Sequence, residues 1–177
     1  MSALLSLLAR LAGLIASIAI VLMMLHVTTE VVLRVGFRAP ASGTIEIVSY
    51  FYMVAAVFLG IFVAAWQNAH IRVDVIANLF SRPLQRVTDL LAELITVVFF
   101  AFFAWGLART ALQKTHQHEA VDAVFAHLTV WPTRWVAVVG LVLALCAASW
   151  RLARMLAGAD TRDAVSDFVV DDDEAVK

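Results

Sequence analysis

Four long apolar stretches constrain this chain more than any other feature of its sequence. They cover about residues 11–35, 45–68, 86–113 and 132–156. A helix needs about 20 predominantly apolar residues to cross a bilayer, because each unpaired backbone amide in hydrocarbon costs several kcal/mol. Hydrophobic residues make up 63% of the chain and charged residues only 15%, too few to solvate a soluble globule. The sequence predicts an all-α integral membrane protein with four transmembrane helices.

The Lys and Arg residues predict how these helices are oriented. An even number of spans places both termini on one side. With the termini inside, eight basic residues lie on the inner side and five on the outer side. Cytoplasmic loops carry an excess of Lys and Arg, so we expect both termini in the cytoplasm. Residues 1–157 are predicted to form the membrane domain, and residues 158–177 a mobile acidic tail.

Three ionisable residues near the end of the first span form a polar stripe. His26, Glu30 and Arg34 follow one another at intervals of four residues and therefore share one helix face. Ionisable groups at membrane depth are costly and suggest a function by default. Three interpretations stay open: a partly hydrated pair that anchors the helix end, a contact with another subunit, or an ion pathway.

The segment between the second and third spans predicts a short amphipathic interfacial helix over about residues 71–82. Apolar residues recur there at helical spacing opposite polar ones, a pattern typical of a helix lying in the membrane interface. Asp74 falls in its first turn, where the helix dipole stabilises a carboxylate. Pro83 then suits the start of the third helix. Periodicity alone predicts a connector on the membrane surface. Its apolar residues are Ile71, Val75, Ile76, Leu79 and Phe80, and its polar residues are Arg72, Asp74, Asn78 and Arg82.

Residues that often carry chemistry give little signal here. His116, His118 and Glu119 could present two imidazoles and a carboxylate to a metal, but the set is short and polar loop residues are the favoured interpretation. The chain has no Gly-rich phosphate cradle and no nucleophile elbow. We therefore expect no enzyme, no cofactor or metal in this chain, and no nucleic-acid partner.

The fourth span gives two expectations about individual side chains. Cys146, the single cysteine, is expected to be buried there as a small apolar filler. Arg151 and Arg154 follow the uncharged part of the span and are expected to extend outward to the interface.

Several short motifs occur together along the chain. They are Arg34 with Phe37 at the end of the first span, Gly43 with Glu46 at the start of the second, an H-I-x-V-D core over residues 70–74, and Trp131-Pro132 before the fourth. With the length, the four spans and the inside termini, they resemble the small membrane subunit of tripartite ATP-independent periplasmic (TRAP) transporters, the DctQ-like family. The resemblance covers about residues 10–157.

The resemblance implies a three-part system in the bacterial cytoplasmic (inner) membrane. A soluble extracytoplasmic solute-binding protein captures an organic acid. A large multi-span permease subunit then carries it by an elevator movement driven by an ion gradient, usually of sodium. The small permease subunit scaffolds the large one within the membrane lipid and helps the receptor to dock. Substrate and sodium are implied to bind in the large partner, with no cofactor in this subunit.

The resemblance also implies roles for individual residues. Arg34, Glu46, His70, Arg72 and Asp74 are candidates for contacts with the large subunit or for holding the structure together. Arg38 and Lys114 are candidates for docking the receptor, because they lie in the outward segments 36–44 and 114–134.

Three alternative functions stay open from the sequence. The first is an autonomous small four-helix exporter in which Glu30 binds protons and substrate in turn, although Glu30 lies near the end of its span. The second is the small subunit of a tricarboxylate-type carrier, which also has about four spans. The third is an assembly factor or sensor that does not transport, for which the acidic tail is the main argument.

Overall fold

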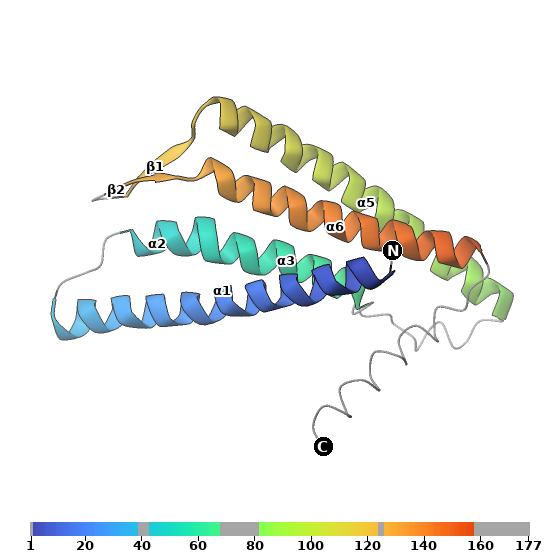
Figure 1. Cartoon of the computed structure of the whole chain (residues 1–177), viewed down its shortest axis with the longest axis horizontal. Helices are drawn as coiled ribbons and strands as arrows, with labels where there is room; N and C mark the ends of the chain where they lie inside the picture. The colour runs from blue at the N-terminus through green and yellow to red at the C-terminus, as the bar shows by residue number, and fades with distance from the viewer. Residues whose placement is uncertain (1, 39–42, 68–81, 124–125, 158–177) are drawn as a thin grey trace, which may run out of the picture.

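The computed structural model describes residues 2–38, 43–67, 82–123 and 126–157, and its elements are drawn in Figure 1. The first helix, α1, covers Ser2–Gly36. Three helical segments then follow without a break: α2 over Thr44–Ile47, the π-helical turn η1 over Val48–Tyr52, and α3 over Met53–Trp66. The long helix α5 covers Arg82–His116. The strands β1 (Ala120–Ala123) and β2 (Ala126–Thr129) lead to the last helix, α6, over Trp131–Leu156.

Four helices are long and apolar enough to cross a membrane, as the sequence predicts. They are Leu4–Gly36 within α1, the continuous helix Thr44–Trp66, Leu84–His116 within α5, and α6. α1 and α5 extend beyond the apolar stretches seen in the sequence, since both have 35 residues. The predicted interfacial helix over residues 71–82 lies outside the described residues except at Arg82, where α5 begins, and so does the acidic tail 158–177.

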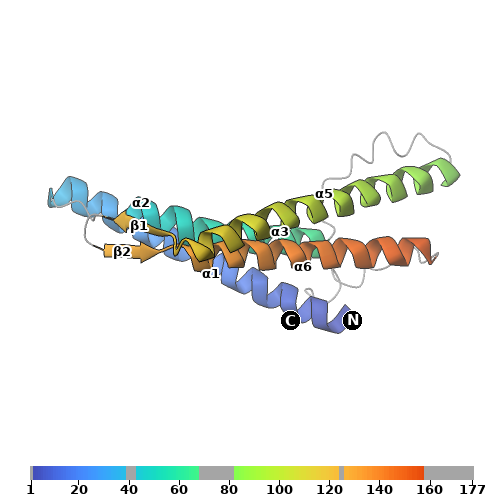
Figure 2. The same cartoon turned by 90° about the horizontal axis from the view of Figure 1, so that it is seen from above.

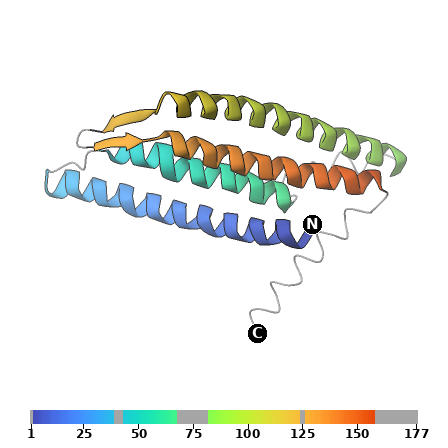
Figure 3. The same ribbon diagram turned by 45° about the horizontal axis from the view of Figure 1, so that its top comes forward.

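The helices form a layer, in the order α1, α3, α6, α5. α1 packs on α3, α3 on α6, and α6 on α5, so the two outer helices each have one main neighbour. Figures 1 and 3 show the four side by side, with α1 and α5 at the two edges. Seen from above in Figure 2, the first halves of α1 and α5 diverge to opposite sides of α6. Much of the apolar surface of both edge helices is therefore exposed in the isolated chain.

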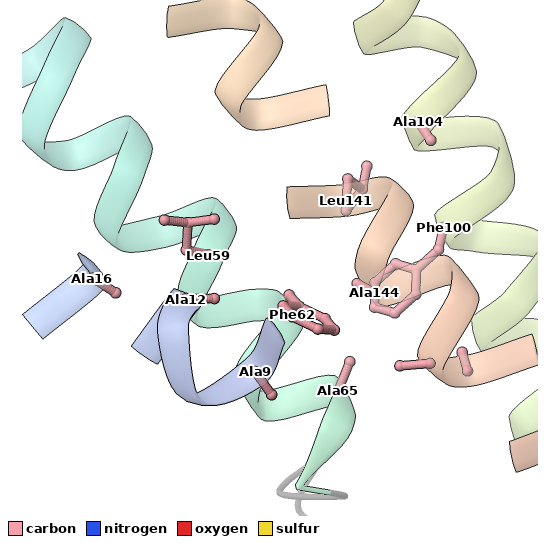
Figure 4. Packing of buried hydrophobic residues seen from close by; sticks show 12 residues of the cluster. Ala9, Ala12, Ala16, Leu59, Phe62, Ala65, Phe100, Ala104, Leu141 and Ala144 are labelled. Carbon is pink, nitrogen blue, oxygen red and sulfur yellow. The ribbon is translucent and has the colours of Figure 1, made fainter. Parts of the chain in front are cut away.

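Small side chains let neighbouring helices approach closely. Buried alanines of α1, including Ala9, Ala12 and Ala16, face Leu59 and Phe62 of α3, as Figure 4 shows. Phe62 is fully buried and points toward α6. Helices in a bilayer associate through van der Waals packing rather than through the hydrophobic effect, because lipid tails are as apolar as leucine side chains. Complementary shape at these small residues is therefore what stabilises the layer.

Gly140 lies closer to a neighbouring helix than the other glycines of the described helices do. A Cβ atom at position 140 would lie 2.6 Å from the carbonyl oxygen of Phe58 in α3, which is shorter than real Cβ contacts. α3 and α6 therefore pack backbone against backbone at this level. Because α1 and α5 lie outside them, this contact joins the two halves of the layer.

The structure corrects three expectations from the sequence. Residues 114–134 are not a plain loop, because α5 continues to His116 and an antiparallel β-hairpin pairs Ala120 with Thr129. Cys146 is exposed rather than buried, since it faces away from the neighbouring helices of this chain. Arg151 does not extend freely to the interface. Its side chain is only 13% exposed and pairs with Glu93 of α5.

Candidate functional site

Four groups of polar side chains among the described residues are candidates for a functional site. Two lie at the end of the layer where the β-hairpin is found, which we call the hairpin end. A third joins α5 to α6 toward the other end, and the fourth is on the free face of α5. Figure 1 shows that the last turns of α1 and the start of α2 also lie at the hairpin end.

The predicted stripe on α1 divides between two sets of contacts. Arg34 donates from Nε to Oε1 of Glu30 over 2.8 Å, and its Nη2 lies 2.5 Å from the same oxygen. The Glu30 side chain is 8% exposed, whereas that of Arg34 is 60% exposed. The buried carboxylate is therefore neutralised within its own helix by a cation that reaches the surface.

His26 instead faces the start of the second span. Its Nε2 lies 3.5 Å from Oγ1 of Thr44, a buried residue at the beginning of α2. Its ring also meets the Tyr52 ring edge to face, with the centroids 5.9 Å apart. Tyr52 closes the π-helical turn η1, and π-helical turns inside α-helices occur frequently at functional sites. His26 thus joins α1 to the irregular start of the second span, whereas Glu30 pairs within α1.

A second cluster at the hairpin end is built around Glu119. Arg134 of α6 donates to both of its carboxylate oxygens, over 2.5 and 2.8 Å, and Lys114 of α5 lies 3.3 Å away. The Glu119 carbonyl accepts the backbone N–H of Val130 at 3.0 Å. The hydrogen bond from Arg134 holds the pKa of the Glu119 carboxyl below its ordinary value. This one residue therefore ties the end of α5, the hairpin and the start of α6 together.

Trp135 and Thr115 reinforce the same corner. The indole Nε1 of Trp135 donates to Oγ1 of Thr115 over 3.0 Å, and that hydroxyl donates to the Ala111 carbonyl over 2.7 Å. Both charged and neutral hydrogen bonds therefore fix α5 against α6 here.

A buried ion pair fixes the same two helices nearer their other ends. Arg151 of α6 donates from Nε to Oε1 of Glu93 over 3.1 Å, and its Nη2 lies at the same distance. The Glu93 side chain is 7% exposed. Removing one member of such a pair leaves an uncompensated charge in a medium of low dielectric. α5 and α6 are therefore clamped by charge near both ends.

Of the other predicted site residues, the structure describes Arg38, Glu46 and Lys114. Arg38 is exposed and has a positive φ of 53°, and Glu46 is half-buried in α2. Lys114 is one of the cations that face Glu119, with its side chain 34% exposed. His70, Arg72 and Asp74 lie outside the described residues. Within the described ranges, no group of three His, Cys, Asp or Glu side chains is arranged to hold a metal ion.

The interhelical pairs Glu93–Arg151 and Glu119–Arg134 were not predicted from the sequence. The sequence does hold a signal for the first pair. Glu93 interrupts the third apolar span and Arg151 follows the uncharged part of the fourth, and an unpaired charge at either position is costly. No periodicity connects positions so far apart, however. Their pairing depends on how the two helices pack.

Comparison with protein families gives an identity that agrees with this architecture. The family model for the DctQ component of tripartite ATP-independent periplasmic transporters matches residues 23–158, which is most of the chain. The match covers the second, third and fourth spans completely and the first span from residue 23 onward. No curated protein matches the chain. By its family match and its four apolar helices, this chain belongs to the DctQ family, the small membrane component of TRAP transporters.

Proposed function

We propose that this chain scaffolds the large permease subunit of a TRAP transporter in the bacterial inner membrane and helps to dock the soluble solute-binding protein. The observation that carries the proposal is the family match over residues 23–158. The transporter takes up an organic acid. The large subunit drives this uptake with a gradient of sodium ions. This subunit itself needs no cofactor.

The shape and the ion pairs of the layer support a scaffolding role. Clamps near both ends hold α5 against α6, through Glu119 with Arg134 and through Glu93 with Arg151. A static part of an elevator-type carrier must resist the movement of its partner. The layer also exposes broad apolar faces on its two edge helices, which a larger membrane protein can cover.

Orientation follows from the excess of Lys and Arg on the side of the membrane that holds both termini. With both termini in the cytoplasm, the hairpin end faces the periplasm and Arg38 is exposed to the soluble receptor. Lys114 contributes to the same surface through the Glu119 cluster. Arg34, Glu46, His70, Arg72 and Asp74 are proposed to contact the large subunit or to support the corners of the fold.

Co-purification tests the scaffolding role. A tag on this chain is used to isolate it from native membranes in mild detergent, and the bound proteins are identified by mass spectrometry. We expect one much larger multi-span protein in fixed proportion to this chain. Recovery of a stable homodimer alone contradicts the proposal and favours the small exporter that uses Glu30.

Receptor docking needs its own experiment, with the complete three-part system in proteoliposomes. Charge reversal in Arg38→Glu is expected to slow receptor-dependent uptake at low ionic strength, because charges at the rim of an interface act mainly on the association rate. The matched control is Arg38→Lys, which keeps the charge and should retain uptake. Equal uptake by the two variants at low salt rules out this role for Arg38.

A further inference from the structure

The side of α5 that faces away from α6 carries an exposed stripe at alternating intervals of three and four residues. The opposite side of the helix, including Glu93, Phe100 and Ala104, is buried. A 3-4 spacing keeps side chains in one line along a helix and allows a second helix to pack against them. We call these residues the α5 stripe: Ile95, Val98, Phe102, Trp105, Arg109 and Leu112.

The α5 stripe contains a charge at membrane depth. The uncharged part of α5 between Glu93 and Arg109 is shorter than the roughly 20 residues that cross hydrocarbon. A spanning segment of that length therefore includes at least one of the two charges, and both lie within the candidate span Leu84–His116. Glu93 is neutralised by Arg151, whereas no carboxylate of the described residues forms an ion pair with Arg109.

The Arg109 side chain points away from the water at the nearer membrane interface, so hydration does not account for its charge. Its Cζ lies 4.4 Å from the centre of the Trp105 ring, one turn back toward the middle of the helix. Trp105 is about 16 Å along the axis from His116, at 1.5 Å per residue. An arginine exposed to lipid extends toward the nearer interface. Arg109 instead lies over the Trp105 ring, which is itself 58% exposed.

The free face of α1 provides a contrast within the same molecule. Its exposed line of Leu7, Leu11, Leu14, Ile18 and Val21 has the same spacing but consists of aliphatic residues alone. Such a face is satisfied by lipid tails. Binding hot spots are enriched in Trp, Tyr and Arg, and the α5 stripe contains both Trp105 and Arg109. Lipid tails are therefore sufficient to cover the free face of α1, whereas the α5 stripe requires a partner for its arginine.

We propose that the α5 stripe is the surface on which the large permease subunit packs, and that this partner presents a carboxylate to Arg109 beside Trp105. The inference rests on the proposed function and adds the face of contact and the chemistry at its centre. A carboxylate would remove the cost of an unpaired cation at membrane depth, and an ion pair there also fixes the register of the two subunits.

Photo-crosslinking in the assembled complex tests the face directly. A photoreactive amino acid replaces Phe102 in the α5 stripe or, as the matched control, Leu14 on α1, two positions that are both highly exposed. The complex is irradiated in native membranes and the adducts are identified by mass spectrometry. We expect an adduct with the large subunit from position 102 and none from position 14.

Other outcomes of this crosslinking overturn the inference. An adduct with the large subunit from position 14 alone places the interface on α1. An adduct between two copies of this chain from position 102 shows that the stripe is a homodimer contact. No protein adduct from position 102, in membranes where tagged wild-type chain still recovers the large subunit, shows that the stripe faces lipid. That last comparison separates failure of this inference from failure of the proposed function.

Charge reversal tests the carboxylate. Arg109→Glu is expected to reduce the recovered large subunit by about tenfold or more, because breaking a buried charge pair across an interface is costly. Arg109→Lys should retain most of it. Substituting Arg or Lys for the partner carboxylate identified by crosslinking should restore binding of Arg109→Glu. An unchanged elution profile of each isolated variant shows that it is folded, and full recovery with Arg109→Glu overturns the proposal.

Discussion

Gly140 of α6 lies directly against the backbone carbonyl of Phe58 in α3, so the two halves of the layer touch through main-chain atoms. Any side chain at position 140 would have to displace α3. The sequence shows only a glycine in an apolar span, a common feature of membrane helices. Its role is visible only when α3 is placed beside it.

We therefore expect Gly140→Ala to lower the stability of the fold. Overpacking of a well-packed interface costs about 1–3 kcal/mol, and here the obstacle is backbone rather than a flexible side chain. Thermal unfolding in mild detergent, followed by circular dichroism, measures the change. Gly106→Ala is the matched control, because a Cβ there meets nothing within 4 Å, and its stability should stay equal or rise slightly. Similar melting temperatures for the two variants would contradict the close contact.

The buried pair of Glu93 and Arg151 predicts non-additive behaviour. Glu93→Met alone removes the carboxylate that accepts from the Arg151 guanidinium and is expected to cost about 3–5 kcal/mol. Adding Arg151→Met should recover much of that loss, because two apolar side chains can replace a buried pair at little cost. A double-mutant cycle on thermal stability measures the coupling. Additive losses would show that the two side chains do not depend on each other.

The pair of Glu30 and Arg34 predicts an asymmetry, since only the carboxylate is buried. Arg34→Ala leaves that carboxylate without its cation and should cost about 1–3 kcal/mol, the desolvation penalty of a buried polar group. Glu30→Gln leaves behind an exposed arginine that water can solvate, so its effect should be smaller. Unfolding of the two variants at neutral pH gives the comparison. A larger effect of Glu30→Gln would contradict the burial of its side chain.

The Glu119 cluster predicts a loss of stability in acid. The pKa of Glu119 is lowered in the folded chain, chiefly by the hydrogen bond from Arg134, from an ordinary value of 4.5. The carboxylate therefore stabilises the fold fully above about pH 4.5, and this contribution is lost as the pH falls through the lower folded pKa. Glu119→Gln should lower stability at pH 7 and weaken its dependence on acid. Melting temperatures of both proteins between pH 3 and pH 7 measure this.

Glu46→Gln is the control for that experiment, because no ion pair to Glu46 is found among the described residues. It should keep the acid dependence of the wild-type chain. If Glu119→Gln also kept it unchanged, the acid sensitivity would belong to other carboxyl groups.

The candidate site could be predicted in part. The His26, Glu30 and Arg34 stripe was expected because residues four apart share a helix face, and Glu30 does pair with Arg34. The partners of His26 in the second span were not expected, since no local pattern connects it to Thr44. The β-hairpin was missed for a related reason. Its strands have only four residues each, and the backbone N–H groups of Val130 and Trp131 donate to the Glu119 carbonyl across its base, a contact that no local pattern predicts.

The sequence by itself determined that this chain has four membrane-crossing helices. Satisfying backbone hydrogen bonds in hydrocarbon is a local requirement, and each apolar stretch meets it alone. Only the tertiary structure decided that the helices lie in the order α1, α3, α6, α5, that Arg151 reaches Glu93 rather than water, and that Cys146 stays exposed. These outcomes depend on which helix surfaces fit each other, and apolar helices in lipid differ in shape far more than in hydrophobicity.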